Sequence, residues 1–529
     1  MTGALRRAIA LAALAGCTVG PAYHVPPAPL PGTPGYKETV GGPWRVAQPA
    51  DAMLRGAWWR VFGEPELDAL EAQLRTGNQT IAQAVANLDA ARAQIRAAQA
   101  AYYPTLTASP SVVTGRSGGG GVGSFVSTGT GTTGTTGTTT GTTAGTGTGT
   151  TGTTGGSGAS GTTGGSGASG VGTIGGGGGG RFTSYSLPID ASWAPDLFGR
   201  VRNTVRQARS SAQASAADLA GQELLEQATL AATYFQLRGQ DALQELLDAT
   251  VAADQWIYEL ARARFETGVD TEVAVVQAEQ TLQAARVQAT SAGILRAQYE
   301  HAIATLIGRP ATAFSLARRA RLTAPPAIPT GAPSRLLERR PDIAGAERRM
   351  AAANATIGIG YAAYYPDLTL SGAGGLASTA ISSLLSWPSR FWSVGATVSE
   401  MVFDGGLRRA NIDQARAAYN ASVAAYRQTV LAAFQQVEDA LAQTRILGHE
   451  IEQQRRTVEL AGRAFELEQA RYESGIDPYI NLMQEQALLL EARQTLVGLE
   501  VQHMTSAVAL VEALGGGWQR SELSAHDRR

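Results

Sequence analysis

The sequence repeats itself, and this duplication constrains the fold more than any other feature. The segment AYYPTLT at 101–107 recurs at 363–369 as AYYPDLT. RFETGVD at 264–270 recurs at 471–477 as RYESGID. A third pair, each member ahead of a long stretch rich in Ala, Gln and Arg, is Phe198-Gly199-Arg200 and Phe403-Asp404-Gly405-Gly406. Three matched landmarks in the same order indicate two copies of one structural unit.

Both copies have the same predicted order of elements: helix, strand, loop, strand, very long helix and shorter helix. In the first copy we expect helices at 66–102, 197–265 and 271–308 and strands at 104–113 and 182–193. In the second copy we expect helices at 335–362, 407–473 and 479–513 and strands at 367–376 and 391–402. The predicted fold is therefore mainly α-helical with a small β part.

The same landmarks divide the chain into six predicted parts. These are a signal peptide 1–16, a Pro- and Gly-rich tether 17–63, a first repeat 64–309, a proline-containing linker 310–334, a second repeat 335–514 and a tail 515–529. The first repeat carries a Gly/Thr/Ser-rich loop insertion at 115–180. Such a composition cannot bury a core.

Apolar and polar residues alternate along the predicted strands. In the predicted strand 182–193, Leu187, Ile189 and Trp193 fall on one face, whereas Ser186 and Asp190 fall on the other. A period of two over about ten residues is typical of a strand with one face in lipid. A half-buried sheet in a soluble sandwich is the alternative, but helices of this length fit no sandwich.

Four predicted strands are too few to form a membrane barrel alone. An open sheet edge in lipid leaves unpaired backbone groups, each of which costs several kcal/mol. Barrels made from one chain start at about eight strands. If these strands lie in a membrane, several copies of the chain must share one barrel.

The two longest predicted helices, 197–265 and 407–473, each span on the order of 100 Å. A stripe along the second has coiled-coil spacing and comprises Tyr419, Val423, Tyr426, Val430, Phe434, Val437 and Leu441. This stripe predicts supercoiled neighbours. A hollow helical cylinder, a solid bundle and an extended coil all fit this composition, and the strand hairpins between the helices favour the cylinder.

Glycines end both long helices. Gly268 and Gly475 can supply the left-handed residue that closes a helix and turns the chain back. Arg264 and Arg471 lie in the last turn, where a cation suits the helix dipole. A structural role in capping is sufficient to explain these residues.

The first residues are typical of a lipoprotein signal. Arg6 and Arg7 precede a short apolar run, which ends in Leu14-Ala15-Gly16-Cys17 and resembles the bacterial lipobox. In such signals the cysteine is lipidated and becomes the new N-terminus. Cys17 is the only cysteine, so a disulfide within one subunit is excluded. Thr18 after the cysteine implies sorting to the outer membrane.

Composition argues against several functions. The formal net charge of −1 gives no support for a nucleic-acid partner. After the first residues no run of eighteen apolar residues predicts a membrane helix. The five histidines are scattered, without the spacing of a metal site or a catalytic triad. We therefore predict neither an enzyme nor a cofactor, apart from the covalent lipid on Cys17.

The lipobox, the duplicated plan, the Phe403–Gly406 motif and the two Arg-x-x-x-Gly turns together resemble the outer membrane factor family. These proteins are the TolC-like exit ducts, and the lipobox places the resemblance in their lipoprotein branch. Further matches are Trp58-Trp59-x-x-Phe62, Trp193-x-x-Asp196-x-Phe198-Gly199-Arg200, Arg340-Pro341-Asp342-Ile343 and Gln277-Ala278-Glu279. The resemblance covers nearly all of the chain after Cys17.

The resemblance implies a homotrimer whose twelve pooled strands form one β-barrel in outer-membrane lipid, continued by an α-helical barrel across the periplasm. The turns from strand to helix would be Phe198-Gly199 and Phe403-Asp404-Gly405-Gly406. The helical tips would meet a periplasmic adaptor protein and form the aperture through Arg264, Gly268, Asp270, Arg471, Gly475 and Asp477. Substrate would come from an inner-membrane pump and pass through the duct without chemistry.

This sequence departs from the family pattern near the tips. Family members often carry aspartates six and nine residues past the tip glycine, and this chain has Ala274, Gln277, Asn481 and Gln484 there. We therefore do not predict a ring of acidic residues that binds cations. The alternative function is a lipid-anchored periplasmic adaptor or adhesin with coiled-coil helices.

Overall fold

The computed structural model describes residues 19–29, 36–38, 56–116, 181–320, 324–326, 328 and 336–518. Cys17 and most of the Gly/Thr/Ser tract lie outside the described residues. The chain forms two compact units. We call 1–100, 197–365 and 402–529 the helical unit, and 101–196 with 366–401 the strand unit. Each unit thus takes segments from both predicted repeats.

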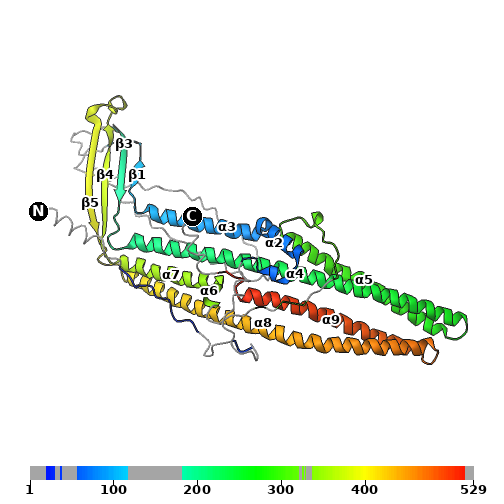
Figure 1. Cartoon of the computed structure of the whole chain (residues 1–529). Helices are drawn as coiled ribbons and strands as arrows, with labels where there is room; N and C mark the ends of the chain where they lie inside the picture. Colours follow the sequence, from blue (N-terminus) through cyan, green and yellow to red (C-terminus); the bar gives the residue numbers. More distant parts are fainter. Residues whose placement is uncertain are drawn as a thin grey trace, which may run out of the picture. The chain divides into compact units, whose positions relative to one another are not determined.

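The helices of the helical unit lie side by side in two rows (Figure 1). One row has the order α3 (Gln79–Ala100), α4 (Arg200–Glu266), α7 (Pro341–Ala362) and α8 (Leu407–Glu473). The other has the order α5 (Glu272–Leu306), α4, α9 (Tyr479–Ala513) and α8. Helix α8 therefore stands at one end of both rows, and α3 and α5 stand at the other.

Corresponding helices in the two halves of the sequence have equal lengths. Helices α4 and α8 each have 67 residues, α5 and α9 each have 35, and α3 and α7 each have 22. The predicted helices 407–473 and 479–513 match α8 and α9 residue for residue. The prediction of a mainly helical chain with a small sheet is confirmed.

The prediction of one continuous helix at 66–102 is wrong. The chain forms α2 (Pro65–Gly77) and then α3, with a break at Asn78. The Asn78 side chain accepts from the Ile81 N–H at 2.9 Å and donates to the Leu306 carbonyl at 2.9 Å. An asparagine that serves as an N-cap and bonds to another helix favours this break over a straight helix. Similarly, α6 (Leu336–Arg339) precedes α7 because Pro341 disfavours helix at Arg340.

The strand unit is an antiparallel sheet with the order β1–β3–β4–β5 (Figure 1). Its strands are β1 (Thr105–Ala108), β2 (Ser111–Arg116), β3 (Arg181–Trp193), β4 (Asp367–Ser378) and β5 (Arg390–Ser399). Both β1 and β2 pair with β3 in one continuous register. The predicted strand 104–113 is interrupted between them, where Pro110 and Pro188 lack the N–H that a ladder needs. The described sheet therefore has four strand positions.

Two clusters of buried side chains stabilise the middle of the helical unit. The larger surrounds Trp58, which is fully buried in η2 (Trp58–Phe62) and donates to Gln227 of α4 at 3.1 Å. The second includes the predicted α8 stripe. Tyr426, Val430 and Val437 are buried there, and the other stripe residues pack against them. The stripe is thereby confirmed as a packing surface.

An ion-pair network fixes the beginning of the segment between the two repeats. Arg238 on α4 is buried and bonds to Asp241 at 2.6 Å and to Glu66 at 2.5 Å. Arg296 on α5 also bonds to Asp241, at 2.7 Å. The two arginines donate to the carbonyls of Ala317 and Leu316 at 2.9 and 2.7 Å. Removing one partner would leave a buried charge uncompensated.

Glu71 on α2 generates a testable prediction. Its side chain is fully buried, and neither carboxylate oxygen has a hydrogen-bond partner among the residues that the structure describes. Burial raises its pKa to about 9. Because the folded-state pKa lies above the unfolded value of 4.5, stability is lost as pH rises from about 4.5 toward 9. We expect Glu71→Gln to raise the free energy of unfolding by about 2–3 kcal/mol at pH 8, with a smaller gain at pH 5.

Denaturant unfolding of the detergent-purified protein at both pH values measures this gain. Asp89→Asn, on an exposed position of α3, is the matched control and should leave both values unchanged. Equal gains for Glu71→Gln at pH 5 and pH 8 would contradict the assigned pKa.

Candidate channel surfaces and helical tips

One face of the sheet is apolar. Cross-strand partners point to the same side of a sheet, so the register assigns each row of side chains to a face. Ala191, Gly372 and Val394 form one row, and Trp193, Leu370 and Ala396 form the next. Val394 is 79% exposed and Trp392, one row further, is 81% exposed. Apolar side chains this exposed suit a hydrocarbon environment on this face.

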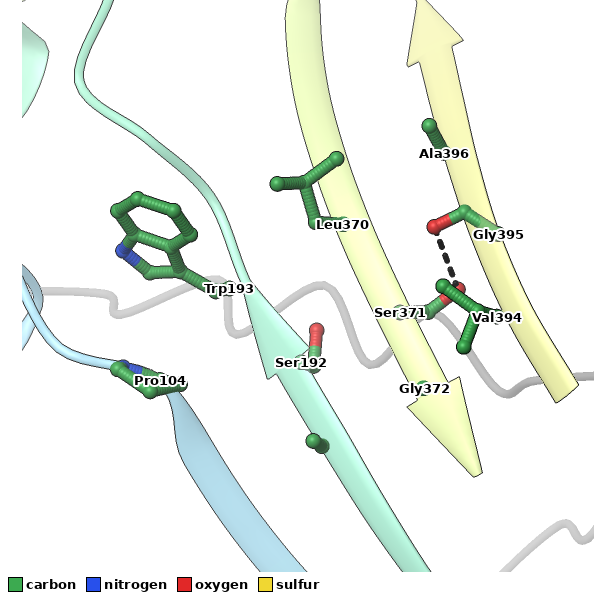
Figure 2. A pocket seen from close by; sticks show the side chains of 10 residues that line it. Pro104, Ser192, Trp193, Leu370, Ser371, Gly372, Val394, Gly395 and Ala396 are labelled. Atoms are coloured by element: carbon green, nitrogen blue, oxygen red, sulfur yellow. Dashed lines mark hydrogen bonds between the residues drawn. The ribbon is translucent and has the colours of Figure 1, made fainter. Parts of the chain in front are cut away.

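A groove of about 440 Å³ lies across these rows, and Gly372 is one of its lining residues. Figure 2 shows the side chains of Trp193, Leu370 and Val394 around this groove. The Ser371 hydroxyl, which belongs to the opposite face, donates to the Gly395 carbonyl at 3.5 Å (Figure 2).

The opposite face of the sheet carries small and polar side chains. Its rows are Thr105, Ser192, Ser371 and Gly395, then Thr107, Asp190, Ala373 and Ser393. No row of large apolar side chains covers these residues within the described strands. Over these rows the two faces therefore differ in polarity, as the alternation in the sequence predicted.

Both ends of the described sheet are open. β5 pairs only with β4, and β1 with β2 pairs only with β3. All ten residues of β5 are exposed. Two rows of backbone donors and acceptors therefore lack strand partners in the part of the chain that the structure describes.

Glycines form the predicted turns into both long helices. Gly199 and Gly406 precede α4 and α8 with φ values of +81° and +93°, which favour glycine. The Asp404 carboxylate accepts from the N–H of Gly406 at 2.9 Å and from Nε of Arg408 at 2.6 Å. These bonds, the Arg408 one foremost, hold the pKa of Asp404 below its usual range.

The aromatic residues of these turns have different surroundings. Phe198 stacks on Tyr365 with ring centroids 4.7 Å apart. Phe403 is 87% exposed, and neighbouring Val402 is 93% exposed. The first turn is thus packed, and the second presents an apolar ridge at positions 402–403.

Gly268 and Gly475 adopt the left-handed conformation at the helical tips, with φ values of +76° and +74°. The Val269 N–H bonds to the Arg264 carbonyl at 2.9 Å, and the Ile476 N–H bonds to the Arg471 carbonyl at 3.0 Å. These bonds close both helices in the same way. The side chains differ between the two tips.

Arg264 links the two tips. It donates to the carbonyls of Tyr472 and Glu473 at 2.8 and 3.2 Å, and its guanidinium lies 4.7 Å from the Tyr472 ring centre. The Tyr472 hydroxyl donates to Asp270 at 3.0 Å, and Asp270 lies 3.6 Å from Arg264. The sequence placed Arg264 at the C-terminus of its own helix, but its side chain neutralises the C-terminus of α8.

Arg471 stays within its own tip and bonds to Asp477. This hydrogen bond holds the pKa of Asp477 below its usual range. Burial, with the nearby Asp270 carboxylate, raises the pKa of the Tyr472 hydroxyl, so this group remains a proton donor. Exposed apolar residues surround both tips and include Val269, Val273, Val276 and Ile476.

Sequence reasoning missed Tyr472 and a buried pair further from the tip. Comparing the repeats could have shown Tyr472, because Phe265 occupies the equivalent position without a hydroxyl. The pair is Asp254 of α4, which accepts a hydrogen bond from Gln486 of α9. Burial raises the pKa of Asp254 to about 6. No local signal separates this aspartate from the solvated ones on the same helix.

The described residues hold no cluster of three or more His, Cys, Asp or Glu side chains suited to a metal ion. None of the described helices is long and apolar enough to cross a membrane.

The model of the family described as outer membrane efflux protein matches residues 70–309 and 332–516. The chain belongs to this family. It is an outer-membrane channel of efflux systems and not an enzyme. The family decides between the two predicted functions, in favour of the channel over the adaptor or adhesin.

Similar proteins cover nearly the whole chain. The probable efflux pump outer membrane protein TtgC of Pseudomonas putida is 29% identical, over 96% of this chain and 93% of its own length. The pyoverdine export outer membrane protein OpmQ of Pseudomonas aeruginosa is 28% identical, over 90% of this chain and 91% of its own length. The solved outer-membrane channel OprN superposes with a TM-score of 0.76 at 27% identity, over 95% of this chain and 100% of that chain.

The contact between the tips generates a second prediction. Arg264→Gln removes a charge-assisted link worth about 1.5–3 kcal/mol. We expect amide hydrogen exchange at 471–477 to accelerate about tenfold, measured by mass spectrometry. Arg262→Gln, on an exposed neighbouring position that forms an ion pair with Glu266 of its own helix, is the control and should leave this segment unchanged. Equal exchange in both variants would show that Arg264 does not hold the tips together.

Proposed function

We propose that three copies of this chain form the passive exit duct of a tripartite efflux or secretion system. The observation that carries this proposal is the two-faced sheet with two open ends. Three copies would pool twelve strands, which is enough to close a barrel and remove every edge from lipid. The polar face would line the duct, and the apolar face with its 440 Å³ groove would meet lipid.

The ends of the helix rows support the same assembly. Helix α8 ends both rows on one side, and α3 and α5 end them on the other, so α8 of one copy can pack against α3 and α5 of the next. The helices of three copies would then form the α-helical barrel. Small residues buried on α4, such as Ala216, Ala217 and Ala231, let it pack against neighbours on two sides.

Exposed apolar residues on α8 and α5 lie at similar distances from the helical tips. Leu467 and Leu460 are about 9 and 20 Å from the end of α8, and Val276 and Val287 are about 6 and 22 Å from the start of α5. All four side chains are more than half exposed. The antiparallel directions of α8 and α5 would bring Leu460 of one copy close to Val287 of the next.

The helical tips would form the aperture and the surface for a periplasmic adaptor. The proposed residues are Arg264, Gly268, Asp270, Arg471, Gly475 and Asp477. Exposed Val269, Val273 and Ile476 offer an apolar contact beside these charges. The Arg264 bonds to α8 would hold the aperture closed in the absence of the adaptor. An inner-membrane pump would deliver small molecules through that adaptor.

The chain would be held in the outer membrane by lipid on Cys17 as well as by the barrel. The proposed division is a signal 1–16, a tether 17–63, repeats 64–309 and 335–514 joined by 310–334, and a tail 515–529. The equal lengths of α4 and α8 and of α5 and α9 support the two repeats.

Disulfide trapping tests the assembly. We expect the double variant Val287→Cys, Leu460→Cys to form a covalent trimer in oxidised membranes, seen as a threefold mass on a non-reducing gel. The only native cysteine is the proposed lipidation site, so the background is low. Trp256→Cys with Leu460→Cys is the control, because Trp256 is exposed on α4 rather than on an end helix. Cross-linked bands of equal intensity in the control would refute the proposed contact.

Transport itself is tested in a strain that lacks its own outer-membrane efflux channel. Expression with the matching adaptor and pump should lower the accumulation of a fluorescent dye several-fold. Arg264→Gln should raise the conductance of the purified channel in planar bilayers, because the tip contact is weakened. A trimer that forms but conducts no ions in either variant would contradict the duct.

A further inference from the structure

Residues 19–24, which we call the strap, lie against two helices of the helical unit, α4 and α7. The Val19 N–H donates to the Phe198 carbonyl at 3.3 Å, and Asn203 of α4 donates to the Val19 carbonyl at 3.2 Å. Asn354 of α7 donates to the Pro21 carbonyl at 3.2 Å. Gly20 packs so closely that a Cβ there would lie 2.8 Å from Cα of Gly358. The strap is thus a fixed part of the fold.

A groove of about 700 Å³ lies between the strap, α7 and α8. Its polar lining comprises His24 of the strap, Asn354 and Tyr361 of α7, Tyr365, and Arg416 and Tyr419 of α8. Ala22 and Ile357 add apolar surface. The groove therefore combines one strong cation, three phenols and an apolar wall, which is a lining suited to an amphipathic anion.

Arg416 has capacity for a further acceptor. Its side chain is 55% exposed, it donates to the Tyr361 hydroxyl, and its ion pair with Asp413 is long at 3.7 Å. Asp413 is itself 60% exposed, so this pair contributes little binding energy. A guanidinium offers five donors in a planar fork, which matches the oxygens of a phosphate.

The neighbouring start of α4 carries unusual charge. Residues 200–217 contain four arginines and no carboxylate, although the N-terminus of a helix disfavours cations. Arg206 donates to Asn203 at 3.2 Å, and Asn203 in turn holds the strap. The start of α4 therefore adds formal positive charge beside the strap.

We propose that this groove binds the headgroup of an anionic membrane phospholipid, with Arg416 as the cation that contacts its phosphate. Two covalent connections place the bilayer near the groove. Val19 follows the proposed lipidation site Cys17 by two residues, about 7 Å at most, and Tyr365 precedes the first residue of β4 by two. The lipid anchor and the barrel of the proposed function enter this proposal only to place the groove near the bilayer.

Native mass spectrometry of the detergent-purified oligomer tests the proposal. Phosphatidylglycerol and phosphatidylcholine of equal chain length are added in parallel. Wild type should retain phosphatidylglycerol at least tenfold more strongly, Arg416→Gln should lose this preference, and Arg416→Lys should lose part of it. Arg427→Gln is the matched control, an exposed arginine on α8 outside the groove, and should behave as wild type.

Several outcomes would overturn the proposal. They are equal retention of the two lipids by wild type, an equal loss in Arg427→Gln, and an Arg416-dependent thermal shift with inorganic phosphate alone. Absence of lipid from the assembled oligomer would show that a second copy covers the groove. If Arg416→Gln fails to fold, the Arg416→Lys variant carries the comparison. Lipid retention is measured without pump or adaptor, so a failure of transport leaves this result interpretable.

Discussion

An unpaired backbone N–H or carbonyl in hydrocarbon costs several kcal/mol, and the described sheet leaves a row of such groups on β1 and another on β5. This constraint bears on both the apolar face of the sheet and the order of the helices. The exposed apolar rows through Leu370 and Val394 suit hydrocarbon, whereas the open ends of a single copy do not. The proposed association of several copies would satisfy both demands, and α8 at one end of the helix rows could then pack against α5 at the other end of the next copy.

The helical unit resolves a related problem through small residues. In the hollow helical barrel that we propose, the helices would have water on two sides and could not rely on one thick apolar core. On α4 the buried residues include many alanines, whereas large side chains concentrate in separate clusters around Trp58, Tyr426 and Tyr472. Between these clusters, polar contacts such as the Asp254–Gln486 pair join neighbouring helices.

The two halves of the chain contain similar hairpins whose side-chain contacts differ. The tip glycines and their backbone bonds are equivalent in both halves. Phe265 in one half corresponds to Tyr472 in the other, and only the tyrosine can donate to Asp270. Likewise Asp404 closes the second turn by bonding to Arg408, whereas the first turn is held by the stacking of Phe198 on Tyr365. A symmetric sequence thus yields an asymmetric set of contacts.

The sequence by itself determined the elements whose signals are local. Helices α8 and α9 could be bounded to the residue, because capping glycines and an apolar stripe are read within a few turns. The two faces of the strands followed from alternation, and the left-handed tip glycines followed from their position. Only the tertiary structure decided the break at Asn78, since its side chain bonds to Leu306, which lies 228 residues away. The same holds for Arg264, which faces the carbonyls of α8, and for the burial of Glu71 and Asp254. A side chain's partner on another helix depends on how the helices pack, and no pattern within one segment specifies it.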